Sequence, residues 1–456
     1  MAETAGRASD RIFERPAELL RALIRFDTTN PPGREAACVQ YVHGLLAAAG
    51  IEARLLARDP ARPNLVARLP GRGDAPPLLL YGHVDVVSTA DQAWRHPPFA
   101  GVIADGYVWG RGALDMKGGV AMMLAAVLRA KAEAVSLPGD VVLAVLSDEE
   151  GVGEYGARYL VEGHPDLFAG VRYAIGEFGG FTLHVGGGRL YPIQVAERRS
   201  GMVRATLRGP SGHANLPLRG GTMAQLGDLL VRLDRRRLPA HVTPVTRRFV
   251  EATAAALPPA TGAVVRQLVD PTRADAALGQ LDALGASSLA QLCEPMLRHT
   301  VNATVVRGAG PDVGAIPGEV VVEMAVTALP GFGPDDVLAE LREVLGDSLE
   351  LEVHLGEPGP AEPDMGLFDT LAAILGEADP GGVPVPWVMP AVTDGRFFAR
   401  LGIQTYGFLP LHLPEGFDFA RTIHAADERV PVDALAFGAD AVFRALQRFG
   451  EAAGAG

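Results

Sequence analysis

The chain has 456 residues, of which 48% are hydrophobic and 21% charged, and its formal charge at pH 7 is −13. This length exceeds what one ordinary core accommodates, so two domains are expected in a globular protein. The acidic balance argues against nucleic acid and anionic membranes as partners. No apolar run approaches the roughly 20 residues that span a bilayer, and residues 1–15 lack the apolar segment of a signal peptide.

The two cysteines, Cys38 and Cys293, lie far apart in the sequence and form no Cys-x-x-Cys pair. They therefore cannot build a thiolate zinc site. Such sparse cysteine usage is typical of a reducing compartment, and a cytoplasmic location is expected.

Strand and helix patterns alternate through the first part of the chain. The spacing of apolar residues predicts helices over 14–26, 35–49, 117–132 and 154–162 and strands over 64–69, 78–84, 140–146 and 171–176. The strands at 78–84 and 140–146 are almost continuous apolar runs, which is typical of strands covered on both faces. This order predicts an α/β fold with a mixed, mostly parallel sheet and helices on both faces.

The pattern changes near residues 196–200. Alternating segments predict strands over 202–208, 301–306 and 319–326, and helices are predicted over 220–233 and 335–345. Residues 238–290 carry no motif that predicts an element. A helix over 367–375, a strand over 404–409 and a helix over 432–448 then resume the first pattern. We therefore predict a discontinuous first domain (1–198 and 360–456) and an inserted α+β domain with an antiparallel sheet (199–359).

Histidine and acidic residues follow several of these elements in a set order. They are His83, Asp115, the pair Glu149 and Glu150, Glu177 and His424. Each alone has an ordinary interpretation, such as a turn histidine, a helix-capping aspartate or a solvated acid. Three of these segments, however, follow apolar strands directly, and the carboxyl ends of such strands form the ligand crevice of an α/β sheet. Together they predict one site.

Two imidazoles and three carboxylates can hold two divalent ions. A bridging Asp115, His83 with Glu177 on one ion, and Glu150 with His424 on the other satisfy the ligand count of a two-metal site. These donors suit zinc, manganese or cobalt, and each ion keeps an open position for water.

Two further acids have roles beside the predicted metal ions. Asp85, two residues after His83, is placed to accept the other ring N–H of that histidine. Glu149 is not needed as a ligand, and we expect it to act as the general base.

The runs 81–85, 110–118 and 148–150 together resemble the co-catalytic zinc amidohydrolase family, which includes aminoacylase, acetylornithine deacetylase, succinyl-diaminopimelate desuccinylase and glutamate carboxypeptidase. The similarity covers nearly the whole chain. Residues 156–177 are most similar to the carboxypeptidase S and N-acyl-amino-acid hydrolase branch. The resemblance implies two metal ions, with zinc as the expected metal, and an inserted lid domain through which the protein forms a homodimer.

The resemblance also implies further site residues. His213, within 211–215, matches a histidine that reaches the partner's active site and stabilises the oxyanion. Asn302 matches a lid asparagine, and Thr393 and Arg396 match a segment that shapes the substrate site. Two alternatives stay open: Asn302 satisfies a neighbouring backbone group, or Arg396 is a structural ion-pair partner.

The chain departs from the family in the lid. Family members commonly have Asp-x-Arg where this sequence has 325–327, so Thr327 replaces the arginine. This replacement argues against a substrate carboxylate clamped at that point, unless Arg198, Arg199 or Arg307 substitutes.

The expected function is metal-dependent hydrolysis of an amide bond in an N-acyl amino acid or a small peptide. Two enzymatic alternatives use the same site, namely a carbamoyl-amino-acid hydrolase and an esterase. A non-catalytic metal- or peptide-binding protein is the third alternative. The presence of Glu149 disfavours it, since such a protein has no need of a base.

Overall fold

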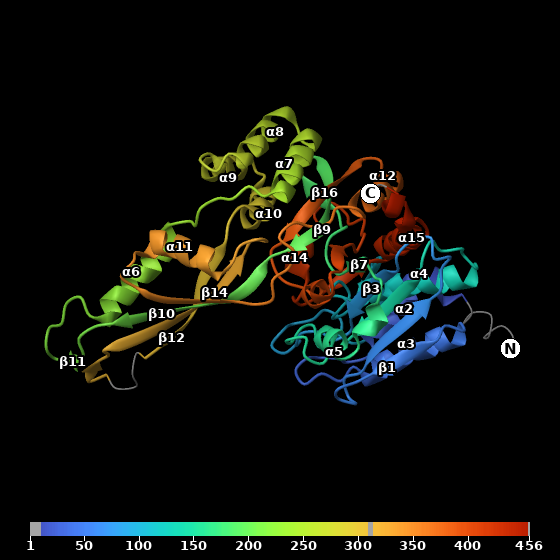
Figure 1. The fold of residues 1–456 in the computed structure, drawn as a ribbon, viewed down its shortest axis with the longest axis horizontal. Helices are drawn as coiled ribbons and strands as arrows, with labels where there is room; N and C mark the ends of the chain where they lie inside the picture. Colours follow the sequence, from blue (N-terminus) through green and yellow to red (C-terminus); the bar gives the residue numbers. More distant parts are fainter. Residues whose placement is uncertain (1–10, 309–312, 455–456) are drawn as a thin grey trace. The chain divides into compact units, whose positions relative to one another are not determined.

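The computed structural model describes residues 11–308 and 313–454, and the chain divides into two compact units (Figure 1). Unit 1 comprises Met1–Val195, Pro363–Trp387 and Thr393–Gly456, and unit 2 comprises Ala196–Glu362 and Val388–Val392. The catalytic and lid roles expected for the two domains stay predictions. Within the described ranges, no helix combines the length and apolarity needed to cross a bilayer. Cys38 and Cys293 are buried, free and in different units.

A nine-stranded mixed sheet forms the centre of unit 1, which confirms the predicted fold class. Its order is β1 (Ala53–Leu56), β2 (Asn64–Leu69), β6 (Val141–Leu146), β3 (Leu78–His83), β7 (Tyr173–Gly176), β17 (Gln404–Gly407), β9 (Gly188–Glu197) and β16 (Gly382–Met389), with β8 (Leu183–Val185) on β9. The four central strands, from β6 to β17, pair in parallel. The flanking pairs from β1 to β6, and the pairs of β9 with β17 and β8, are antiparallel.

Helices cover both faces of this sheet. The helices of unit 1 are η1 (Ile12–Glu14), α2 (Pro16–Ile24), α3 (Ala36–Ala48), α4 (Lys117–Ala132), α5 (Ala157–Gly163), η2 (Pro165–Phe168), α12 (Phe368–Ala378), α13 (Gly395–Phe398), η4 (Ala399–Leu401), α14 (Phe419–Thr422), α15 (Val432–Arg448) and η5 (Phe449–Gly454). Leu79 and Tyr81 of β3 pack in one core cluster with α5 and α13. Gly82 lies on the other face of the sheet. Because it has no side chain, Met116 and Val120 of the α4 region pack closely against it. Alternate residues of β3 thus serve two apolar layers, as its sequence predicted.

Four strands of this sheet, β1, β8, β9 and β16, were not predicted from the sequence. Both β9 and β16 contain prolines, Pro192 in the first and Pro384 and Pro386 in the second. Proline cannot donate to a ladder, and it is tolerated at sheet edges. The sheet order ends at β16, so its prolines occupy the position that accepts them. Unit 1 also contains a small sheet of β18 (Arg429–Pro431), β5 (Tyr107–Trp109) and β4 (Val102–Ala104).

Unit 2 is built on a four-stranded antiparallel sheet, as predicted. Its order is β12 (Thr300–Arg307), β14 (Glu319–Ala328), β10 (Arg199–Arg208) and β15 (Glu350–Leu355), with a separate pair of β11 (Gly212–His213) and β13 (Ala315–Ile316). Alternate residues of β10 and β14 form a core with α6 (Thr222–Arg235) and α11 (Pro334–Leu345). This alternation produced the strand prediction.

Residues 238–290 form helices rather than an irregular segment. They contain α7 (Pro244–Ala256), α8 (Pro259–Arg266), η3 (Gln267–Val269), α9 (Ala274–Ala283) and the start of α10 (Ser287–Leu297). A start signal was present, because Thr243 caps the amide of Thr246 and Pro244 occupies the first turn of α7.

Candidate metal centre

The predicted ligands of unit 1 gather at one edge of its sheet. His83 ends β3, Glu149 and Glu150 lie in the turn after β6, and Glu177 directly follows β7. Strands β6, β3 and β7 are parallel neighbours, so these three segments leave the sheet at the same edge. Asp115 precedes α4, and His424 follows α14.

The carboxylate of Asp115 lies between the two histidines. Its Oδ1 is 3.1 Å from Nε2 of His83, and its Oδ2 is 3.1 Å from Nε2 of His424. Glu177 Oε2 is 3.3 Å from the same His83 nitrogen, and Glu150 Oε1 is 3.1 Å from the His424 nitrogen. The pairing of donors is the one that a bridging Asp115 predicts.

Glu149 lies beside this group, and its carboxylate has no hydrogen-bond partner among the described side chains. Its Oε2 is 3.9 Å from His83 Nε2, and its side chain is 13% exposed, so solvent reaches it. Burial and the nearby charge of Glu177 raise the pKa of Glu149 well above its ordinary value. A carboxyl group with a raised pKa is suited to accepting and returning protons.

The electrostatics of the ligands reflect close packing of like charges. Burial raises the pKa values of Glu150 and Glu177, and hydrogen bonds to the histidines only partly offset this effect. Burial lowers the pKa of His83, but its hydrogen bonds to carboxylates outweigh burial and raise that pKa well above the ordinary value. Hydrogen bonds to Asp115 and Glu150 raise the pKa of His424 to about 10. The carboxylates therefore hold positive charge strongly in this site.

Asp85 has two sets of contacts. Nδ1 of His83 lies 3.0 Å from the Asp85 backbone carbonyl oxygen and 3.5 Å from its carboxylate. The same carboxylate accepts the backbone N–H groups of Glu149 and Glu150, both at 3.1 Å. The backbone of Asp85 orients the histidine, and its side chain orients the turn that carries the base.

Glu428 was not identified from the sequence, although it positions Asp115. It is fully buried and accepts the backbone N–H groups of Gly112, Leu114 and Asp115 at 2.8–3.2 Å and the guanidinium of Arg111 at 2.6 Å. In the sequence, one feature points to Glu428 as part of the site, namely its position four residues after His424.

Asp394 is a second buried acid that the sequence did not single out. It is 1% exposed, and neither carboxylate oxygen has a hydrogen-bond partner among the described residues. Burial raises its pKa to about 8. The charge of Glu177 contributes to this rise, and the charges of Arg396 and His83 oppose it.

The neighbouring residues Thr393 and Arg396 make contacts within unit 1. Thr393 is fully buried, and its hydroxyl accepts the backbone N–H of Gly395 at 3.0 Å. The Arg396 guanidinium donates to the Thr393 carbonyl oxygen at 3.0 Å and lies over the ring of Phe397. Their predicted substrate contacts stay predictions.

The other predicted residues belong to unit 2. His213 is exposed on β11, and its Nδ1 accepts the N–H of Asn215 at 3.2 Å. Asn302 is exposed on β12 and lies opposite Ala325 in the ladder. Their predicted roles also stay predictions.

Three arginines could substitute for the family arginine that Thr327 replaces, and each of them has hydrogen-bond partners. Arg198 is 3% exposed and donates to Thr300 and to two backbone carbonyl groups. Arg199 donates to the Gly356 carbonyl, and Arg307 forms a two-point contact with Glu323 at 3.1 and 3.2 Å. Each guanidinium therefore has a structural contact within unit 2.

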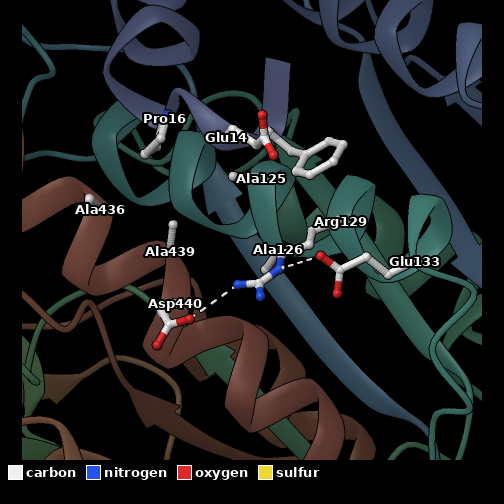
Figure 2. Close-up of a pocket in the computed structure, with 10 residues that line it drawn as sticks. Glu14, Pro16, Ala125, Ala126, Arg129, Glu133, Ala436, Ala439 and Asp440 are labelled. Carbon is white, nitrogen blue, oxygen red and sulfur yellow. Dashed lines mark hydrogen bonds and ion pairs between the residues drawn. The ribbon is translucent and has the colours of Figure 1, made fainter. Parts of the chain in front are cut away.

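A separate surface pocket of about 210 Å³ lies between η1, α4 and α15 (Figure 2). Four of its ten lining residues are alanines, and Arg129 bonds Glu133 at 2.9 Å and Asp440 at 3.1 Å within it. None of the predicted site residues lines it, so it has no part in the metal centre.

Comparison with known proteins places the chain in a family. Residues 79–448 match the sequence profile of peptidase family M20/M25/M40. The succinyl-diaminopimelate desuccinylase of Paracoccus denitrificans is 41% identical over 148 residues, which cover 32% of this chain. The match spans only 38% of that relative's length.

Two solved structures are similar to nearly the whole chain. An M20-family metallo-carboxypeptidase from Sulfolobus solfataricus has a TM-score of 0.65 at 16% identity, with coverage of 96% of this chain and 99% of that one. A Bacillus subtilis protein described as a dinuclear metal-binding peptidase of the M20 family has a TM-score of 0.59 at 15% identity, with coverage of 96% and 99%. These likenesses support the fold, and the match over 79–448 shows that the protein belongs to peptidase family M20/M25/M40.

Proposed function

We propose that the protein is a metal-dependent hydrolase that cleaves an amide bond of an N-acyl amino acid or a small peptide. One observation carries this proposal: the two oxygens of Asp115 face two different histidines, each at 3.1 Å. A carboxylate so placed is the bridge that a pair of divalent ions requires. The fold shared with a dinuclear metal-binding peptidase supports it.

The donors fit two such ions. His83 and Glu177 would hold one, His424 and Glu150 the other, and Asp115 both. Glu177 Oε1 is buried and has no hydrogen-bond partner among the described residues, as a ligand oxygen would. When bound, the ions supply Lewis acidity to the scissile carbonyl and acidify a water. Zinc is the expected metal, and manganese and cobalt accept the same nitrogen and oxygen donors.

The chain's own residues move the proton and hold the charge. Glu149 takes a proton from the attacking water and returns it to the leaving amine. Asp85 keeps His83 and the Glu149 turn in place. His213, from the partner chain, donates a hydrogen bond to the oxyanion.

The substrate class follows from the family and from the lid. The relative matched over part of its length is named as a desuccinylase, and its reaction cleaves an acyl-amino bond. Thr327 replaces the family's arginine, and Arg198, Arg199 and Arg307 are already bonded. These contacts support the proposal that a substrate carboxylate is not bound through these groups. Asn302, Thr393 and Arg396 are the proposed substrate contacts.

We further propose a cytoplasmic homodimer that forms through unit 2. Strand β12 stands at one end of the four-stranded sheet order, and Val305 and Val306 on it are 36% and 45% exposed. An exposed apolar edge strand is a template for pairing with a second chain. The two buried free cysteines agree with a reducing compartment.

The experiment that tests the activity begins with removal of metal by a chelator. The stripped protein, and the protein reloaded with zinc, manganese or cobalt, are assayed on N-acetyl and N-succinyl amino acids, dipeptides, carbamoyl amino acids and simple esters. Hydrolysis of the acyl amino acids or dipeptides by reloaded protein alone is expected. Activity confined to carbamoyl amino acids or to esters would select one of those alternatives, and activity that survives stripping would reject the metal mechanism.

The role of Glu149 is tested by Glu149→Ala. General-base catalysis contributes about 10²–10⁴-fold, so turnover should fall by at least this factor. Metal content should stay close to two ions per chain, since Glu149 is not needed as a ligand. Turnover numbers and metal analysis on the same preparation measure both, and unchanged hydrolysis would reject its role as base.

A further inference from the structure

A buried polar bridge lies behind the turn that carries Glu149 and Glu150. The side-chain nitrogen of Asn30, a residue 8% exposed, donates to Asp85 Oδ2 and to Asp148 Oδ1, both at 3.0 Å. Asp85 and Asp148 are themselves 0% and 3% exposed. Two buried carboxylates repel each other, and the amide between them supplies one N–H to each.

The two carboxylates that Asn30 joins determine the path of this turn. Asp85 accepts the backbone N–H groups of Glu149 and Glu150. Asp148 begins the turn with a φ of 67°, a left-handed conformation that costs energy for a residue with a side chain. Its Oδ2 accepts the N–H of Tyr155 at 3.1 Å, which closes the far end of the turn.

The bridge is anchored at both of its own ends. The backbone N–H of Asn30 donates to the Val86 carbonyl at 2.9 Å, directly beside Asp85. On the other side, Arg62 contacts Asp148 at 3.0 Å and Glu35 at 2.8 Å, and both side chains of this second pair are buried. The bridge is thus tied to Val86 and Arg62, which lie outside the predicted ligand set.

From this network we propose that Asn30 is a positioning residue, which acts through Asp85 and Asp148 to hold the general base Glu149 and the ligand Glu150 in place. The inference rests on the proposed function of these two acids. It predicts that loss of the Asn30 amide weakens metal binding and turnover while substrate binding is kept, because the Asn30 side chain bonds Asp85 and Asp148, which are not among the predicted ligands or substrate contacts.

Gly151 provides an independent way to disturb the same bridge. A Cβ added at Gly151 would lie 2.5 Å from Asp148 Oδ1 and 3.1 Å from the side-chain nitrogen of Asn30. Gly151→Ala therefore displaces the bridge and leaves every donor and acceptor present. The residue is exposed, so the fold is expected to survive the change.

The test compares Asn30→Ala and Gly151→Ala with matched controls. Gln404→Ala removes another buried amide of unit 1, one that donates to the carbonyl groups of Val195 and Thr405 and accepts the N–H of Asp364. Gly376→Ala adds a methyl group where nothing lies within 4 Å. All four variants are compared with the parent protein in thermal unfolding, in zinc titration calorimetry and in assays at saturating metal.

For Asn30→Ala and Gly151→Ala we expect zinc affinity and kcat to fall about 10- to 100-fold, the effect typical of residues behind metal ligands. KM should stay unchanged, and both controls should keep parental zinc affinity. If the parent protein hydrolyses no substrate of the panel, the proposed function fails, and calorimetry still decides this inference. Zinc affinity of Asn30→Ala equal to that of Gln404→Ala would overturn it.

Discussion

At the scale of single residues, the candidate metal centre depends on acids outside the predicted ligand set. Glu428 is the clearest case, because one buried carboxylate accepts three backbone N–H groups of the loop that presents Asp115. Gly112 in that loop has a φ of 83°, a conformation that favours glycine. The loop therefore has a shape that only its glycine and its buried acid together sustain.

The substitution Glu428→Gln tests this dependence. It keeps the size of the side chain, but it leaves the buried guanidinium of Arg111 without its counter-charge. Breaking a buried pair in this way costs about 3–5 kcal/mol of unfolding free energy. Chemical denaturation measures this loss, and calorimetry should also show weaker zinc binding.

Glu162→Gln provides the surface comparison for this variant. Glu162 bonds Arg158 and Arg400 on the exterior of unit 1, where ion pairs contribute little. Its unfolding midpoint should equal that of the parent protein. A Glu428→Gln protein as stable as Glu162→Gln would contradict the assigned role.

At the scale of elements, Asp379 joins three parts of unit 1. It follows α12, precedes β16, and accepts hydrogen bonds from Arg189 and Tyr191 of β9. Burial raises its pKa, but the bonds to Arg189 and Tyr191 outweigh burial and hold the pKa below its ordinary value. This contact helps to explain why the proline-containing β16 stays on the sheet.

A pH dependence follows from the lowered pKa of Asp379. A carboxyl group whose folded pKa lies below its unfolded pKa stabilises the fold above the unfolded value, about 3.9, and loses this contribution as pH falls through the folded value. Asp379→Asn should therefore lower unfolding free energy by about 1–3 kcal/mol at pH 7. The difference in unfolding free energy between Asp379→Asn and the parent protein should shrink below about pH 4. Denaturation curves at both pH values measure this, and a difference independent of pH would contradict it.

A second contact between elements, in unit 2, resembles a metal site but has different chemistry. His241, His299 and Glu340 offer three donor atoms within 4.8 Å of one another. Nδ1 of His299, however, accepts the backbone N–H of Leu329 at 3.0 Å, so a neutral ring carries its proton on Nε2, the atom that faces Glu340. His241 bonds the same carboxylate at 2.7 Å. The cluster therefore joins the segments before α7 and β12 to α11.

The prediction is that this cluster holds no ion. Metal analysis of the reloaded parent should give two ions per chain rather than three. Glu340→Ala should leave that number unchanged while it lowers the unfolding temperature, since the buried imidazole of His299 and the partly buried imidazole of His241 lose a neighbouring carboxylate. A third ion that disappears in Glu340→Ala would contradict this assignment.

At the scale of the whole molecule, the proposed dimer makes two chains responsible for one site. Val306→Lys places a charge on the exposed edge of β12 and should block pairing there. Sedimentation equilibrium should then show a monomer, and hydrolysis should fall because His213 no longer reaches a partner's site. Leu284→Lys changes a residue that is 54% exposed after α9 and should remain dimeric. A dimeric Val306→Lys protein would exclude β12 as the contact.

Much of the architecture could be predicted because it depends on local patterns. The unbroken apolar runs of β3 and β6 predicted buried strands, and the alternation in β10 and β14 predicted a half-covered sheet. Strand β16 escaped prediction, because its prolines suit a strand only once a neighbouring strand makes it an edge. The helices within residues 238–290 were not predicted, because the segment is rich in alanine and its helical apolar spacing does not stand out from that composition.

The sequence by itself indicated which side chains gather at this edge of the sheet, since His83, Glu149 and Glu177 lie at or just after the ends of neighbouring apolar strands. Only the tertiary structure decided what holds those donors. Asn30 and Glu428 act over separations of 55 to 317 residues, and no local spacing marks a residue whose partners are so distant in the chain. Burial removes the water that would otherwise satisfy these polar groups, so their hydrogen bonds are decided by the folded interior.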